Sequence, residues 1–167
     1  MNDIIVGIDP GTRITGYAVL KVTDGRFEIL DFGCIKPPVH LDLAMRYLII
    51  FNGIDHLIAK HKATAVSVET QFVSKNIQSA SKLWMARCAV MIAAAKNGVK
   101  VHEYAPRKAK LAIVGNGAAS KEQVQRMVQA LLRLPQLPEP EDAADALALA
   151  VCHANQRNLC TNFSVAN

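Results

Sequence analysis

The sequence has 167 residues, of which 51% are hydrophobic and 20% charged, with a formal net charge of +5. This length suits one domain with its own core, and this composition excludes disordered and fibrous proteins. The longest apolar stretches, 47–54 and 88–95, fall far short of the about 20 residues that cross a bilayer. We therefore expect no membrane partner. None of the four cysteines has CxxC spacing. Because the chain is not short and its first residues lack the pattern of a secretory signal, we also expect reduced thiols and a cytoplasmic location.

The start of the chain has the pattern of three strands. Residues 4–8 form a short apolar run that ends at Asp9-Pro10-Gly11, which is typical of a buried strand followed by a turn. Residues 14–22 and 27–35 are also strand-like, and the Asp24-Gly25 step between them is a hairpin signal. We therefore predict three consecutive antiparallel strands.

Helices and strands alternate in the rest of the chain. The spacing of apolar residues predicts helices over 41–61, 77–97, 106–113, 121–133 and 141–156, with strands over 65–69 and 99–103. Three prolines make 134–140 a connector. This order indicates an α/β protein with a mixed five-stranded sheet. We expect residues 1–157 to form one domain and residues 158–167 a short flexible tail.

Acidic residues stand where three of the apolar elements begin or end. Asp9 closes the first strand and Glu69 the fourth, while Asp142 and Asp145 share one face of the last helix. Carboxylates gathered at strand ends would repel one another unless divalent cations lay between them, and all-oxygen ligands suit Mg²⁺ or Mn²⁺. Two such ions would hydrolyse a phosphodiester. Taken singly, each acid also fits a structural role, as a turn former, a solvent-facing strand end or a helix-dipole partner.

Basic residues concentrate between positions 100 and 133, where seven Lys and Arg face two acids. A basic face beside an acidic pocket is typical of a nuclease, although a solvated helix face is the alternative. Phe72 and Lys75 follow Glu69, and an exposed ring there could stack on bases, although burial under a loop is the commoner outcome. Trp84, Met85 and Met91 lie on one predicted helix and indicate core or a subunit interface.

Five motifs in register resemble the RuvC Holliday-junction resolvases of bacteria. Three carry the acidic residues, namely GIDPGTRITGY at 7–17, VETQF at 68–72 and DAADALA at 142–148. Two carry basic residues, EYAPRKAK at 103–110 and VGNGAASK at 114–121. The resemblance covers residues 3 to about 156. At position 70 this sequence has Thr where many members of the family have Gln, and this difference bears on contacts at the junction centre.

The resemblance implies a ribonuclease H-like fold and a homodimer that works alongside the RuvA–RuvB branch-migration complex. It implies a Mg²⁺-dependent endonuclease that resolves four-way DNA junctions by paired nicks, in recombination and repair. By position, Asp9, Glu69, Asp142 and Asp145 would be the catalytic ligands of two Mg²⁺ ions, for which Mn²⁺ can substitute. The expected DNA-binding residues are Phe72, Lys75, Arg107, Lys110 and Lys121.

Three other interpretations stay open at this point. Asp9–Thr12 also fits the phosphate turn of actin–hexokinase kinases, but such kinases close two domains over ATP and this chain supplies one. A YqgF-like RNA-processing nuclease would share a related fold. A non-catalytic junction-binding protein would gain nothing from acids placed near phosphate. ATP binding would identify the first, and cleavage of RNA rather than four-way DNA the second.

Overall fold

The computed structural model describes the backbone of residues 2–70 and 77–164 and the side chains of residues 3–70 and 77–157. The strands are β1 (Asn2–Asp9), β2 (Thr15–Thr23), β3 (Arg26–Ile35), β4 (Ala65–Glu69) and β5 (Lys100–Tyr104). The helices are α1 (Leu43–His61), α2 (Ile77–Lys96), α3 (Pro106–Val114), α4 (Lys121–Leu131) and α5 (Glu141–Ser164). None of these helices is both long and apolar enough to cross a membrane, among the residues described.

The five strands form one sheet in the order β3-β2-β1-β4-β5. β1 and β3 pair with β2 in antiparallel fashion, whereas β4 pairs in parallel with both β1 and β5. Asp24 and Gly25 both have positive φ at the β2–β3 turn, as a tight hairpin with this sequence requires. The mixed five-stranded α/β sheet predicted from the sequence is therefore confirmed.

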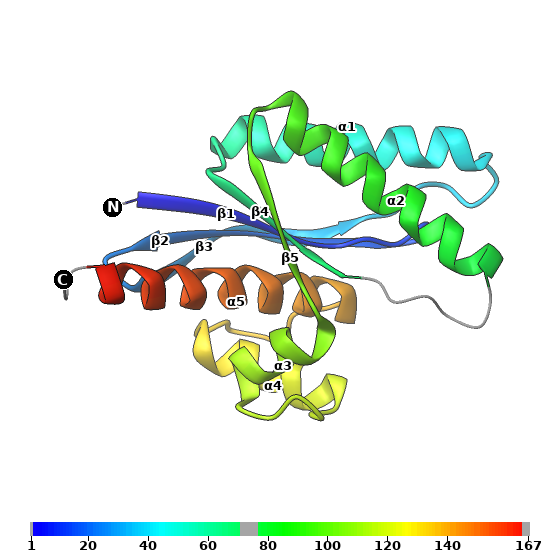
Figure 1. The fold of residues 1–167 in the computed structure, drawn as a ribbon. Helices are drawn as coiled ribbons and strands as arrows, with labels where there is room; N and C mark the ends of the chain where they lie inside the picture. The colour runs from blue at the N-terminus through cyan, green and yellow to red at the C-terminus, as the bar shows by residue number, and fades with distance from the viewer. Residues whose placement is uncertain (1, 71–76, 165–167) are drawn as a thin grey trace.

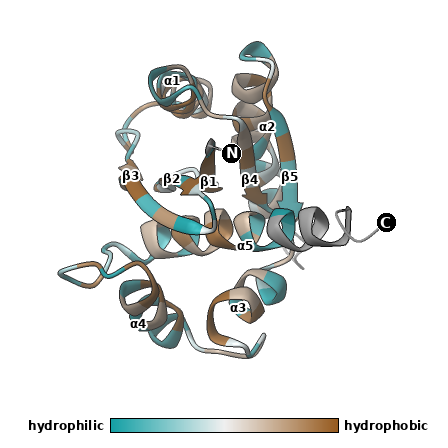
Figure 2. Cartoon of the chain, turned by 90° about the vertical axis from the view of Figure 1, so that its left-hand side faces the viewer, coloured by the Kyte–Doolittle hydropathy of each residue, from teal (hydrophilic) through white to brown (hydrophobic). Residues whose placement is uncertain are grey.

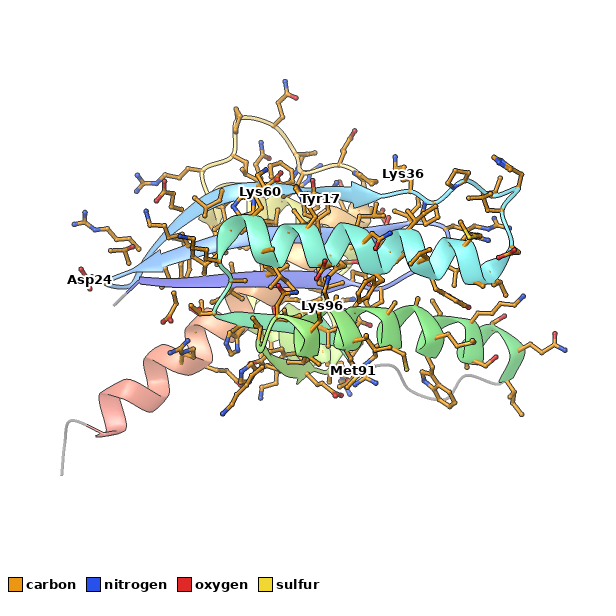
Figure 3. The ribbon with its side chains drawn as sticks, turned by 90° about the horizontal axis from the view of Figure 1, so that it is seen from above. Tyr17, Asp24, Lys36, Lys60, Met91 and Lys96 are labelled. Carbon is orange, nitrogen blue, oxygen red and sulfur yellow. The ribbon has the colours of Figure 1, made fainter. Side chains whose placement is uncertain are left out.

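Helices cover both faces of the sheet (Figure 1). α1 and α2 lie side by side on one face, as the view in Figure 3 shows, and α5 lies on the other. α3 and α4 lie on the side of α5 that faces away from the sheet (Figures 1 and 2). Each face has its own apolar core, one centred on Val6, Ile54 and Val90 and the other on Ile5, Leu20 and Leu147.

α5 approaches the sheet closely because small residues line the contact. A Cβ atom on Gly7 would lie 2.1 Å from the carbonyl oxygen of Ala146, and one on Gly16 would lie 1.9 Å from that of Asp142. Both distances are impossible for a real side chain, so only glycine fits at these two positions. The helix itself is rich in buried alanine, since α5 is enclosed by the sheet on one side and by α3 and α4 on the other.

Several predicted boundaries differ from the structure. The first long helix begins at Leu43 rather than 41, because the Asp42 side chain accepts a hydrogen bond from Met45 N–H and caps the helix. The predicted helix over 121–133 ends at Leu131, and Arg133 takes a left-handed conformation. The prediction that the last helix ends near 156 was wrong. It continues to Ser164, because residues 157–164 contain neither Gly nor Pro to stop it.

Candidate active site

A pocket of about 280 Å³ opens where the ends of β1 and β4 meet α3, α4 and α5. Its charged lining comes from five residues, Asp9, Glu69, Lys110, Lys121 and Asp145. Its apolar wall is made by Pro106, Ala109, Val124, Ala148 and Leu149. Three of the four predicted catalytic acids therefore line one pocket, together with two of the predicted DNA-binding lysines.

Parallel pairing brings Asp9 and Glu69 together. Ile8 of β1 stands opposite Val68 of β4 in the register, so the two acidic residues that follow leave the sheet at the same edge. The apolar residues before them are fully buried, which fixes both strands in the core. The carboxyl edge of a parallel pair is where α/β proteins place their sites, and this register carries both acids there.

The hydroxyl group of Thr15 stabilises the turn that follows Asp9. Thr15 is fully buried, and its Oγ1 donates to the carbonyl oxygen of Gly11 at 2.7 Å while accepting from the Gly11 N–H at 3.2 Å. These two bonds close the turn that joins β1 to β2. The conformation that follows Asp9 is therefore fixed from within the turn.

A guanidinium holds the same turn from outside. Arg46 of α1 is only 9% exposed and donates a hydrogen bond to the carbonyl oxygen of Thr12. Sequence reasoning missed Arg46. A signal was available, because Arg46, Ile50 and Ile54 recur every four residues and so place a charge on the buried face of the helix.

α5 brings the second pair of acids to the site. Asp145 lines the pocket, while Asp142 lies one helical turn earlier, toward β2 and β3. The backbone of Asp142 packs against Gly16 of β2. Burial, and then the charge of Asp142, raise the pKa of the Cys34 thiol on β3 to about 11. Asp142 does not line the pocket, but its charge acts on Asp9.

The acidic side chains disfavour one another's ionisation. Burial, then the charges of Glu69, Asp145 and Asp142, raise the pKa of Asp9 to about 8. Burial and Asp145 raise the pKa of Glu69 to about 7. Burial also raises the pKa of Asp145, although Lys121 opposes the shift. Such raised values mark carboxyl groups that would be stabilised by a cation.

Two lysines face these acids. The Nζ of Lys121 lies 3.6 Å from a carboxylate oxygen of Asp145 and 3.3 Å from one of Glu141. The Nζ of Lys110 donates to the carbonyl oxygen of Ala119 at 2.8 Å, which ties α3 to the start of α4. The pocket can therefore offer positive charge to a phosphate and negative charge to a metal ion.

The other three predicted DNA-binding residues do not line the pocket as described: Arg107 lies outside its lining, and Phe72 and Lys75 lie outside the described residues. Arg107 is exposed on α3, and its backbone packs beside Gly117. Phe72 and Lys75 fall within 71–76, outside the described residues, so their DNA-binding roles stay predictions. In the part of the chain that the structure describes, no three Asp, Glu, His or Cys side chains are already arranged around one point as metal ligands.

Comparison with known proteins gives one consistent result. The family model for "Crossover junction endodeoxyribonuclease RuvC" matches residues 5–153. A protein of that name from Protochlamydia amoebophila is 60% identical over 151 residues, which cover 90% of each chain. Another, from Ruminiclostridium cellulolyticum, is 43% identical over 93% of this chain and 94% of the relative.

The solved structures agree. Thermus thermophilus RuvC superposes with a TM-score of 0.85 at 33% identity, over 95% of this chain and 97% of the other. The same protein in complex with Holliday junction substrate superposes with a TM-score of 0.89 over the same shares. These two matches confirm the ribonuclease H-like fold and the resemblance found in the sequence.

Proposed function

The chain belongs to the RuvC family of crossover junction endodeoxyribonucleases, and from that premise we propose that its acidic pocket cuts the strands of four-way DNA junctions. Family membership sets aside the kinase, the RNA-processing nuclease and the non-catalytic junction binder that the sequence had left open. The observation that carries the proposal is the meeting of Asp9, Glu69 and Asp145 with Lys110 and Lys121 in one pocket. The proposal for the substrate is supported by the likeness to T. thermophilus RuvC in complex with Holliday junction substrate.

We propose that Asp9, Glu69, Asp142 and Asp145 hold two Mg²⁺ ions, with Mn²⁺ able to substitute. Their chemistry fits, because carboxylate oxygens are the ligands these ions prefer. Burial, and then repulsion from neighbouring carboxylates, raise the pKa values of Asp9 and Glu69, and a cation would offset both effects. Once bound, such ions activate water and stabilise the leaving oxygen of a phosphodiester.

The residues of the chain itself position the phosphate. Lys110 and Lys121 direct positive charge into the pocket, opposite the acids, where a phosphodiester would otherwise be repelled. The apolar wall, which includes Ala109 and Leu149, limits access of water to that side of the pocket. Thr15 and Arg46 keep the turn after Asp9 in place, so that this carboxylate is pre-organised.

We propose a homodimer, because a four-way junction presents two equivalent strands and a two-fold enzyme matches that symmetry. A candidate interface lies on the outer face of α2. Exposed apolar side chains recur there seven and eight residues apart, at Ile77, Trp84, Met85, Met91 and Ile92. Met85→Glu would place a charge within that face. We expect it to shift sedimentation from dimer to monomer and to replace paired nicks with single ones.

Two further proposals rest on the family alone. We propose that the enzyme works with the RuvA–RuvB branch-migration complex, and that it acts in the cytoplasm, where its DNA substrate lies. A pull-down of the purified chain with RuvA and RuvB, with and without a four-way junction, tests the first. Recovery of the chain only when the junction is present would show that the DNA alone brings the proteins together.

The deciding experiment is cleavage of a mobile synthetic four-way junction in Mg²⁺, with all four strands mapped. We expect symmetric paired nicks from the native chain and none from Asp9→Asn. Junction binding without nicks in either protein, over varied junction sequences and with Mg²⁺ or Mn²⁺, would overturn the proposal. Cleavage of RNA but not of the junction would overturn it as well.

A further inference from the structure

Tyr104 closes the strand end that carries Glu69. It is the last residue of β5, stands opposite Glu69 in the parallel register, and is only 4% exposed. Its carbonyl oxygen accepts a hydrogen bond from the Thr70 N–H at 2.8 Å. The backbone of Tyr104 therefore holds the chain just beyond Glu69.

The side chain of Tyr104 reaches the helix that carries the other acids. Its Oη lies 2.7 Å from Nδ1 of His153, and one of these atoms donates to the other according to the imidazole tautomer. His153 is 2% exposed and lies on α5, eight residues beyond Asp145. Burial, with the charges of His102 and Arg157, lowers the pKa of His153 to about 4, so the ring is neutral at neutral pH.

Among the described residues, the bond to Tyr104 is the hydrogen bond recorded for the His153 ring. The Nε2 atom of His153 is buried and has no hydrogen-bond partner among the described residues. The imidazole also stacks on His102 of β5, with ring centroids 4.2 Å apart. Leaving a buried polar atom unpaired is costly, so the bond to Tyr104 is the main polar anchor of this ring.

The same tyrosine contacts the helix that carries Lys110. The Nζ of Lys108 lies 5.6 Å from the centre of the Tyr104 ring, and the carbonyl oxygen of Lys108 accepts a weak hydrogen bond from the Cys152 thiol at 3.8 Å. The end of β4 contacts the backbone of Tyr104, whereas α5 and α3 contact its side chain, so all three elements meet at one buried residue.

We propose that the Tyr104–His153 hydrogen bond positions the nuclease centre, because it fixes α5 against the strand end that holds Glu69. Both are positioning residues, since neither lines the pocket. The bond sets the placement of the Asp145 carboxylate relative to Glu69, and with it the capture of metal ions between them. This inference rests on the proposed function of the pocket.

The test is Tyr104→Phe, which removes one hydroxyl and keeps the ring. Under single-turnover conditions with a four-way junction, we expect cleavage to slow by about 10- to 100-fold, the range for partners that orient metal ligands. The Mg²⁺ concentration for half-maximal rate should rise, while junction affinity without Mg²⁺ stays within about twofold, because the basic face is unchanged. His153→Asn, whose amide stands near the Nδ1 position, should retain more activity than His153→Leu.

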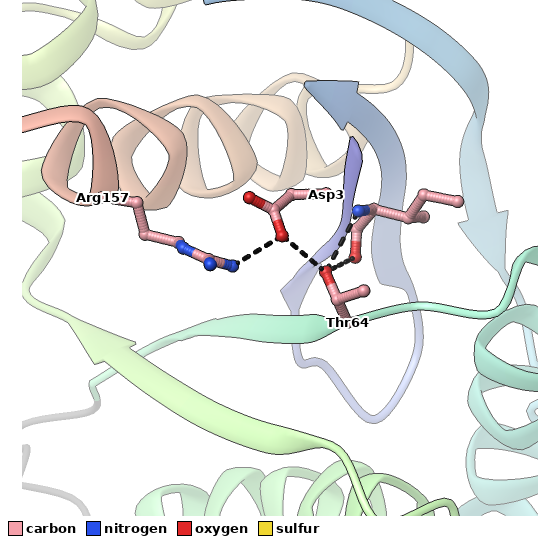
Figure 4. A network of polar contacts seen from close by, with 4 residues as sticks. Asp3, Thr64 and Arg157 are labelled. Carbon is pink, nitrogen blue, oxygen red and sulfur yellow. Dashed lines mark hydrogen bonds and ion pairs between the residues drawn. The ribbon is translucent and has the colours of Figure 1, made fainter. Parts of the chain in front are cut away.

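Thr64→Val is the control, because it likewise deletes one hydrogen-bonding hydroxyl, which joins β1 to the residue before β4. Thr64 Oγ1 accepts from Ile4 N–H and donates to the Ile4 carbonyl, both at 3.1 Å, and lies beside Asp3, which pairs with Arg157 at 2.9 Å (Figure 4). This network ties the starts of β1 and β4 to α5, away from the pocket. Thr64→Val should lower Tm and leave the cleavage rate unchanged.

Each outcome decides the inference. Cleavage by Tyr104→Phe within twofold of the native rate would overturn it. The inference would also be overturned if Thr64→Val lost as much cleavage rate as Tyr104→Phe while its Tm fell by the same amount. A native chain that does not cut four-way junctions would instead contradict the proposed function. In the double variant Tyr104→Phe/His153→Leu, the rate should fall no further than in the slower single variant, because both remove the same bond.

Discussion

The ammonium group of Lys121 lies 3.6 Å from the carboxylate of Asp145, so a cation of the chain itself already stands at the acidic pocket. Burial raises the pKa values of Asp9, Glu69 and Asp145, and the charge of Lys121 opposes each of these shifts. Its side chain is 60% exposed, so it can move without disturbing the core. A metal ion at Asp145 would compete with this ammonium and free it to contact a phosphate.

Lys121→Ala should therefore weaken both cleavage and junction binding. If Lys121 meets one phosphate, the slope of log affinity against log salt should fall by roughly one unit. Lys21→Ala is the control, because Lys21 is also an ion-paired lysine, 2.8 Å from Glu28, but lies on β2 toward the other end of the sheet. The measurement is a salt titration of junction affinity. An unchanged slope would show that Lys121 pairs with the acidic side chains and does not contact a DNA phosphate.

Asp9→Asn should separate cutting from binding. We expect cleavage to fall by more than about 100-fold, the cost of even a misplaced catalytic group, with junction affinity nearly intact. Removing one of several repelling carboxylates should also raise Tm in metal-free buffer near pH 8, because the native charge cluster is strained there. Asp24→Asn at the hairpin tip, labelled in Figure 3, should change neither property. Near-native cleavage by Asp9→Asn would remove Asp9 from the catalytic set.

The metal-free protein should lose stability as pH rises. The folded pKa values of Asp9 and Glu69, about 8 and about 7, exceed the ordinary values of 3.8 and 4.5 that hold in the unfolded chain. At pH values between the unfolded and the folded pKa values, the folded state binds more protons than the unfolded state. The free energy of unfolding is therefore greatest at low pH and declines as the pH rises toward the folded pKa values. Mg²⁺ should counteract this decline, because it replaces the protons on the acids.

Thermal unfolding from about pH 5 to 8 tests this dependence, in EDTA and in Mg²⁺. Tm should fall with pH in EDTA and change less in Mg²⁺. Asp9→Asn should flatten the EDTA curve, which separates the pocket from other titrating groups. A Tm in EDTA that rises over this range, or an Asp9→Asn curve parallel to the native one, would count against the assignment.

Gly16→Ala should damage the site through the backbone. Its Cβ would lie 1.9 Å from the carbonyl oxygen of Asp142, so α5 must move away from β2. We expect a loss of about 1–3 kcal/mol of stability or more, and about a 100-fold loss of cleavage from displaced acids. Gly25→Ala is the control, because its Cβ meets nothing within 4 Å and its cost is only the positive φ. Equal cleavage by the two variants would contradict this role for α5.

The sequence predicted the secondary-structure elements well because these leave local patterns. Apolar runs closed by Asp9 and Glu69 identify strand ends whatever their partners, and the Asp24-Gly25 step identifies its hairpin. The end of α5 was missed because a polar stretch that contains neither Gly nor Pro gives no stop signal. Of the four acids expected to gather at the strand ends, Asp9, Glu69 and Asp145 line one pocket, whereas Asp142 lies outside that lining.

The remainder depends on contacts between distant residues. Tyr104 and His153 are 49 positions apart and follow no common periodicity. The need for glycine at positions 7 and 16 follows from the close approach of α5 to the strands, which the sequence does not show. Lys121 was predicted as part of a basic DNA-binding face, yet it is paired with the acids, and only the approach of α4 to α5 reveals this. The catalytic roles of the four acids stay predictions.

The position of α5 has a consequence for the order in which the protein is made. Every strand precedes this helix in the chain, and both the sheet and two acids of the site depend on it. A nascent chain on the ribosome therefore lacks a covered sheet face and half of its acidic set until residues beyond 141 have emerged. Fragments cut short by damaged messenger RNA would expose apolar surface to proteases and would lack the means to nick the chromosome.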